Sequence, residues 1–160
     1  MKSKKSNPKN TPLEITPAAK EFSNTIFEFR QACNNKEEQL AANFSLTTSE
    51  VKMLRLFEDT TTLPVSEICQ KLALTNGRIS HISSSLEAKG YIKRTTDKND
   101  RRSVTITLTA KSRPFLNKIT SCYINLYDEI LDKIDKKKRS DLLQSLKLTV
   151  EALSQCDKKK

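Results

Sequence analysis

The sequence predicts a mainly α-helical fold with one small β-hairpin, and two features of the chain indicate it. Only two glycines occur among 160 residues, while leucine, isoleucine, lysine and glutamate recur, a composition that favours helices. Residues 86–109 then read as a helix end, a glycine stop and two short strands joined by a basic turn. The stretch before them has helix-turn-helix periodicity. The whole pattern therefore predicts a winged helix-turn-helix lobe at 46–110, flanked by longer helices.

The N-terminal part is expected to hold a polar arm and one long helix. Residues 1–12 contain four lysines and two prolines, which predicts a disordered basic arm. Thr16 and Pro17 begin the helix as its N-cap and its first residue. The helix is expected to run to about residue 42, within a segment at 13–45. Its apolar stripe consists of Phe22, Ile26, Phe29 and Cys33.

Two short helices are expected to open the lobe at 46–110. The first begins with the capping box Thr47-x-x-Glu50. The polar residues 59–62 break it, and residues 63–64 lead into the second helix, which covers 65–72.

A third helix follows the turn at 73–75 and is the candidate recognition helix. It opens at Thr75 or Asn76, ends at Gly90, and buries side chains spaced three and four apart, namely Ile79, Ile82 and Leu86. Its opposite face carries polar side chains, namely Asn76, Arg78, Ser80, His81, Ser84 and Ser85, with Lys89 near the end. The first residues of such a helix reach base edges in the major groove, where Arg78 suits guanine and Asn76 suits adenine. A solvated helix face is the alternative interpretation.

The hairpin after this helix has a basic tip. Residues 91–96 are rich in β-formers, and apolar and polar side chains alternate over 103–108. Lys98, Arg101 and Arg102 lie in the turn between the strands, where they suit a narrow, electronegative minor groove. A surface hairpin whose charges only keep the chain soluble is the alternative.

The C-terminal part is expected to form a helical dimerisation lobe together with segment 13–45. Thr109 is expected to cap a long helix within 111–156, and the basic run at 136–139 is interpreted as a solvated loop before a last helix. Apolar side chains cover wide faces of these helices, among them Phe115, Ile119, Tyr123, Ile130, Leu142, Leu146, Val150 and Leu153. A second copy of the chain would bury them. An intramolecular bundle is the alternative, and 157–160 is a basic tail.

Charge and composition narrow the class of protein. The formal net charge is +10 and the isoelectric point is about 9.5, which favours a polyanionic partner such as double-stranded DNA. No apolar run reaches the roughly 18 residues of a membrane span. The basic start lacks an apolar segment behind it, so no membrane partner and a cytoplasmic location are expected.

Metal, cofactor and enzyme functions are not expected. Four scattered cysteines without a Cys-x-x-Cys pair, and a single histidine, disfavour a zinc site and a disulfide framework. The chain has no nucleophile motif, no Gly-rich phosphate loop and no paired catalytic carboxylates. Cys33 and Cys156 are candidates for a redox switch if they meet across a dimer. Simple burial as small core residues is the commoner fate of free cysteines.

Two motifs resemble the MarR family of transcription regulators. One is Asp100-x-Arg102-x-x-x-Ile106-x-Leu108-Thr109 and the other is Leu86-Glu-x-Lys89-Gly90-Tyr91-Ile92-x-Arg94. Leu46-Thr-x-Ser-Glu50 also looks like the family's entry to this lobe, so the resemblance covers roughly residues 40–116. It implies a homodimeric winged-helix regulator of palindromic operators. Most such regulators are repressors, released by a small ligand or an oxidant.

The resemblance also assigns residues by position. It implies that seven residues contact the major groove or the DNA backbone, namely Thr75, Asn76, Gly77, Arg78, Ser80, His81 and Ser84. It places Arg101 and Arg102 at the wing tip, with Asp100 bracing Arg102 through an ion pair, and it implies a cleft for a small aromatic or lipophilic effector. Family members often carry arginine at the positions of His81 and Ser85, and glycine at Ser112. A winged-helix adaptor that binds protein, or a non-specific DNA-binding protein, is the alternative function.

Overall fold

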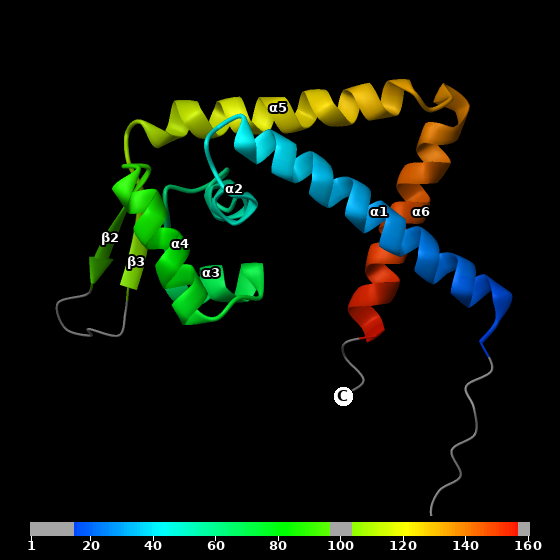
Figure 1. The fold of residues 1–160 in the computed structure, drawn as a ribbon, viewed down its shortest axis with the longest axis horizontal. Coiled ribbons are helices and arrows are strands. Elements are labelled where there is room, and N and C mark those ends of the chain that lie inside the picture. Colours follow the sequence, from blue (N-terminus) through cyan, green and yellow to red (C-terminus); the bar gives the residue numbers. More distant parts are fainter. Residues whose placement is uncertain (1–14, 97–103, 157–160) are drawn as a thin grey trace, which may run out of the picture. The chain divides into compact units, whose positions relative to one another are not determined.

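The computed structural model describes residues 15–96 and 104–156 (Figure 1). The chain divides into two units, residues 1–39 and 40–160, and each is described by itself. Over the described residues the chain forms six helices and three strands, which confirms the mainly helical class.

Helix α1 (Pro17–Ala42) begins where the sequence predicts. The hydroxyl of Thr16 accepts a hydrogen bond from the Ala19 amide at 3.2 Å, as an N-cap does. In the part of α1 that belongs to the first unit, Phe22 and Phe29 are exposed, whereas Ile26 and Cys33 are half-buried. The predicted apolar stripe is therefore largely open to solvent in the single chain.

The second unit holds the helix-turn-helix and the hairpin. Its elements are α2 (Thr48–Arg55), β1 (Thr62–Pro64), α3 (Val65–Leu72), α4 (Asn76–Ala88), β2 (Ile92–Thr96), β3 (Val104–Leu108), α5 (Ser112–Asp132) and α6 (Lys136–Cys156). The fully buried side chains come from α2, the turn after it, α3, α4, the sheet and α5, and include Met53, Phe57, Ile68, Ile79, Leu86, Ile106 and Ile119. One core thus joins all of these elements.

The sheet has three strands, one more than the sequence predicted. All pairs are antiparallel in the order β1-β3-β2, with Ile106 of β3 paired to Leu63 on one side and to Arg94 on the other. The interpretation of residues 59–64 as only a break and a lead-in was wrong. Strand β1 has only three residues, too few for a pattern to be recognised in the sequence, and it ends in proline, which is tolerated because the strand lies at the edge of the sheet.

The start of α5 also differs from the expectation. Thr109 does not cap the helix, because its hydroxyl donates to the Gly90 carbonyl at 2.8 Å. The helix begins three residues later at Ser112, which is buried and donates its hydroxyl to the Tyr91 carbonyl. Lys111 donates to the Lys89 carbonyl at 2.6 Å, at the C-terminal end of α4. These contacts tie the start of α5 to the end of the candidate recognition helix.

The basic run at 136–139 is helical rather than a loop. It forms the first turn of α6, where the Asp135 carboxylate accepts a hydrogen bond from the Lys137 amide at 2.9 Å. Aspartate is a strong N-cap, and its charge favours the positive end of the helix dipole, which explains why four cations in a row do not prevent the helix.

The second half of α5 and the whole of α6 expose apolar side chains. They include Ile124, Tyr127, Ile130, Leu143, Leu146, Leu148, Val150 and Leu153, and no residue of α6 is buried. An uncovered face of this extent usually marks a contact with another molecule. Among the described helices, none is both long and apolar enough to cross a membrane.

Candidate nucleic-acid interface

The turn between α3 and α4 has the geometry of a helix-turn-helix. Ala73 ends α3 in the left-handed region, with φ 51° and ψ 43°. The Leu74 amide then donates to the Cys69 carbonyl at 3.1 Å, which closes the helix end. Thr75 caps α4, since its hydroxyl accepts from the Arg78 amide at 3.5 Å. Three residues therefore suffice to redirect the chain into α4.

Helix α4 separates its apolar and polar sides much as the sequence predicts. Ile79, Ile82 and Leu86 are buried. The seven candidate contacts on the helix and its cap are all exposed: Thr75, Asn76, Gly77, Arg78, Ser80, His81 and Ser84. At Gly77 a side chain would meet nothing within 4 Å, so the backbone there is open to close approach. The structure thus gathers these candidates along the accessible side of α4.

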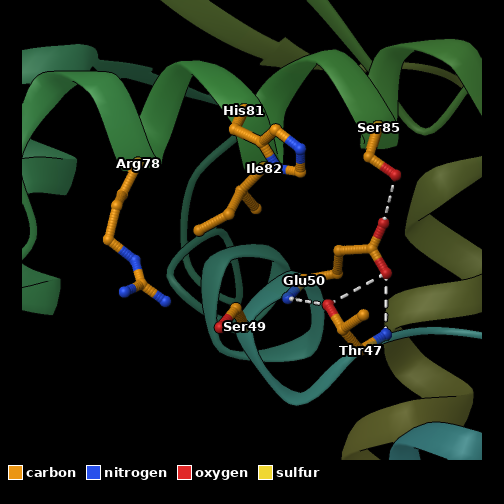
Figure 2. A pocket seen from close by; sticks show the side chains of 7 residues that line it. All are labelled: Thr47, Ser49, Glu50, Arg78, His81, Ile82 and Ser85. Carbon is orange, nitrogen blue, oxygen red and sulfur yellow. Dashed lines mark hydrogen bonds between the residues drawn. The ribbon is translucent and has the colours of Figure 1, made fainter.

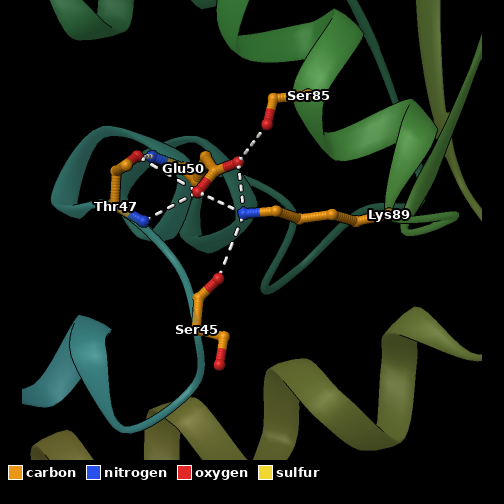
Figure 3. A network of polar contacts seen from close by, with 5 residues as sticks. All are labelled: Ser45, Thr47, Glu50, Ser85 and Lys89. Carbon is orange, nitrogen blue, oxygen red and sulfur yellow. Dashed lines mark hydrogen bonds and ion pairs between the residues drawn. The ribbon is translucent and has the colours of Figure 1, made fainter.

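Ser85 is half-buried and Lys89 remains exposed, but both side chains are bound to another helix, which the sequence did not reveal. Figure 3 shows both side chains turned toward Glu50 of α2. The Ser85 hydroxyl donates to Glu50 Oε1 at 2.7 Å, and Lys89 Nζ lies 2.8 Å and 2.9 Å from the two carboxylate oxygens. Lys89 also donates to the Ser45 carbonyl at 3.1 Å. The sequence revealed the capping box of Glu50 but not these partners on α4.

Glu50 is the buried acid at the centre of this network. Its side chain is 3% exposed, and its carboxylate also accepts from the Thr47 amide at 2.7 Å, which completes the predicted capping box. Burial alone would raise the pKa of Glu50. The hydrogen bonds from Lys89, Thr47 and Ser85 outweigh it and hold the pKa of Glu50 below its ordinary value.

The lowered pKa of Glu50 makes the stability of the fold depend on pH. A carboxylate whose pKa is depressed in the folded state stabilises the fold above its unfolded pKa of about 4.3, and that stability is lost as the pH falls through the lower folded value. Glu50→Gln removes the titrating group, so we expect its free energy of unfolding to fall less steeply below about pH 4.5 than that of the wild type. Urea unfolding at a series of pH values measures this, and parallel curves for the two proteins would contradict it.

A pocket lies beside this network, between α4 and the N-terminal turn of α2. Its lining residues are Thr47, Ser49, Glu50, Arg78, His81, Ile82 and Ser85. Figure 2 shows the side chains of Arg78 and Ser85 extending from α4 toward α2. Arg78 therefore presents hydrogen-bond donors at the N-terminal half of α4, while the C-terminal half is fastened to Glu50.

Asn76, the first residue of α4, has a partner on α3. The thiol of Cys69 donates to Asn76 Oδ1 at 3.0 Å. Bidentate pairing with adenine uses both the oxygen and the nitrogen of an asparagine amide. With the oxygen engaged, the amide nitrogen is the group that Asn76 offers to a base or a phosphate.

The tip of the wing lies outside the described residues. Lys98, Asp100, Arg101 and Arg102 all fall within 97–103, so their predicted contacts stay predictions. The base of the wing is described. Arg94 of β2 donates to Glu87 of α4 through its backbone amide at 2.9 Å and through Nε at 2.7 Å, which fixes the hairpin against the end of α4.

The candidate redox pair stays a prediction as well. Cys33 is half-buried on α1, and Cys156 is exposed at the end of α6. The two cysteines belong to different units of the chain, whose relative positions are not determined. Within the described ranges, no group of three or more His, Cys, Asp or Glu side chains could hold a metal ion.

Comparison with known proteins identifies the lobe. Residues 46–104, which cover the three helices α2 to α4 and the strands up to the start of β3, match the model of the MarR family. This segment is a MarR-family domain. The HTH-type transcriptional regulator PapX of Escherichia coli is 45% identical over 58 residues, which are 36% of this chain and 35% of PapX. The chain thus spans about a third of the length of this relative.

Solved structures share the fold over most of the chain. AbsC, a MarR family transcriptional regulator from Streptomyces coelicolor, has a TM-score of 0.72 and 18% identity, covering 88% of this chain and 97% of AbsC. FabT of Streptococcus pneumoniae, solved in complex with DNA, has a TM-score of 0.70 and 20% identity, covering 84% of this chain and 99% of FabT. The winged-helix fold of the MarR-family domain is therefore shown.

Proposed function

We propose that this chain is a DNA-binding transcription regulator that acts as a symmetric dimer. The observation that carries the proposal is the exposed polar side of α4 within a MarR-family domain, in a chain of net charge +10. The DNA complex of FabT, a protein of the same fold, supports it. Exposed Arg78 and the donor nitrogen of Asn76 suit base edges, and the serines along α4 allow close approach.

The dimer assigns a role to the flanking helices. Segments 13–45 and 111–156 would form the dimerisation lobe, because α1, α5 and α6 all expose apolar side chains. Two copies of α4 would then dock in successive major grooves about 34 Å apart on a palindromic operator. Phosphate contacts, including those expected from Lys98, Arg101 and Arg102, would supply affinity and a steep salt dependence.

Regulation would act through the spacing of the two α4 helices. Any change that moves one MarR-family domain relative to the other prevents both helices from docking together, and so releases the operator. A repressor released by a small aromatic or lipophilic effector, or by oxidation of Cys33 and Cys156, fits this scheme. Unchanged operator affinity after peroxide treatment, with both cysteines oxidised by mass spectrometry, would exclude the thiol route.

The decisive experiment selects bound sequences from a random duplex library at two salt concentrations. A palindrome with half-sites about one turn apart is the expected result. Binding that depends on salt but not on sequence would instead favour a non-specific DNA-binding protein. Weak binding throughout would favour a protein-binding adaptor.

Arg78→Ala is expected to change the preference at one base position of each half-site by about 1–3 kcal/mol, because it removes a bidentate guanidinium. Competition binding with single-base operator variants measures this. The matched control is Arg30→Ala, which removes the same charge from an exposed position on α1. Equal base preferences in the wild type and Arg78→Ala would contradict the assignment.

A further inference from the structure

We propose that Glu50 is a positioning residue that fixes the rotation of α4 about its axis and thereby sets the sequence preference of DNA binding. This inference rests on the proposed function and deepens it. Glu50 lies on α2, with its side chain buried beneath α4, so it acts on DNA only through the residues that α4 presents.

Four polar side chains form one stripe along α4 and its C-cap. Arg78, His81, Ser85 and Lys89 are spaced three, four and four residues apart, so they lie along the same side of the helix. Ser85 and Lys89 are bound to Glu50, whereas Arg78 and His81 are exposed and do not contact it through any hydrogen bond among the described residues. A rotation of α4 that shifted the bound half of the stripe would shift the exposed half by the same angle.

The contacts of Glu50 are more directional than the apolar contacts of α4. Ile79, Ile82 and Leu86 are buried on the adjoining side of α4, but burial of apolar surface depends little on orientation. A buried carboxylate, in contrast, is tolerated only where its oxygens meet donors. Here they meet two side chains of α4 and the capping residue of α2 at 2.7–2.9 Å. One rotation of α4 satisfies all of them.

The network also joins α4 to the loop before α2. Lys89 donates to the carbonyl of Ser45, a residue held in the left-handed region with φ 55°. Thr47, two residues on, binds Glu50 through its amide. The end of α4 is thus fastened both to the loop before α2, through Lys89 and Ser45, and to α2 itself, through Glu50 (Figure 3).

The test compares specific with non-specific binding for Glu50→Gln. Glutamine keeps the shape of the side chain and can cap α2, but it provides no charge for Lys89. We expect the ratio of the dissociation constants for a scrambled and a selected duplex to fall about tenfold, the size of one misaligned base contact. Affinity for the scrambled duplex is expected to stay unchanged, since no phosphate contact is removed.

Two further variants separate positioning from other roles. Ile106→Val lowers stability in the sheet without touching the network, so its binding ratio is expected to equal that of the wild type. Lys89→Met is expected to lower the ratio with an unchanged slope of log affinity against log salt. A slope smaller by about 1 would show that Lys89 contacts a phosphate and would overturn its place in the network.

The outcomes distinguish this inference from the proposed function. A wild-type protein that does not prefer any duplex would overturn the proposed function and this inference with it. A wild type with a clear preference, and a Glu50→Gln variant with the same ratio, would overturn this inference alone. A lowered ratio in Ser85→Ala, which removes only one hydroxyl donor, would further support it.

Discussion

Replacing Arg113 with alanine is expected to lower the free energy of unfolding by about 3 kcal/mol, because hydrogen bonds from a charged donor contribute more than neutral ones. The guanidinium of Arg113, in the first turn of α5, donates to the carbonyls of Phe57, Glu58 and Thr60 at 2.9, 2.8 and 2.8 Å. These carbonyls follow the end of α2, where the chain turns toward β1. Without the arginine, the half-buried carbonyls of Phe57 and Thr60 would lose this hydrogen-bond donor.

Urea unfolding measures this change, and two variants control for it. Arg113→Lys keeps the charge, but one ammonium group does not reproduce the planar fork that reaches all three carbonyls, so an intermediate loss is expected. Lys118→Ala removes a cation from an exposed position of α5 and is expected to change stability by less than about 0.5 kcal/mol. An Arg113→Ala protein as stable as the wild type would show that water replaces the arginine at no cost.

The starts of α1 and α2 and the end of α4 could be predicted because their signals are local. Thr16 caps α1, Thr47 and Glu50 form the capping box of α2, and Gly90 after α4 adopts a φ of 74°. Each signal acts within four residues of the helix end that it marks. The buried stripe of α4 was equally readable, because helical periodicity is a property of the segment itself.

The contacts that position α4 could not be predicted, because they join distant parts of the sequence. Glu50 binds side chains 35 and 39 residues further on, and Arg113 reaches back 53–56 residues. A glutamate at the third position of a helix is explained by capping alone, so nothing in the sequence indicated that Glu50 has further partners. Strand β1 was missed for a similar reason, since only its pairing with β3 makes it a strand.

Together these contacts hold α4 along most of its length. Thr75 caps its start, and Glu50 binds Ser85 within it and Lys89 just after it. Arg94 joins Glu87 near its end to the wing, and Lys111, just before α5, donates to the Lys89 carbonyl. The helix and the base of the wing are therefore expected to move as one body with the start of α5. A regulatory signal would then shift whole MarR-family domains rather than α4 alone.

Such a mechanism requires a dimer, and the apolar stripe of α6 provides the sharpest test of it. Leu143, Leu146, Val150 and Leu153 recur at spacings of three and four and are 37–63% exposed. The double variant Leu146→Gln and Val150→Gln changes no charge and keeps residues compatible with a helix. We expect it to be monomeric by analytical ultracentrifugation, because it removes apolar area from the middle of the stripe.

The same variant is expected to lose at least about 100-fold in affinity for a two-half-site operator, since the second half-site no longer benefits from the high effective concentration of a linked copy. Its affinity for a single half-site should equal that of the wild type, which shows that the MarR-family domain is intact. Leu148→Gln is the matched control, because Leu148 is 57% exposed but lies on the opposite side of α6. If Leu148→Gln is the monomeric variant instead, the interface lies on that other face of α6. If the double variant remains dimeric, α6 lies outside the interface.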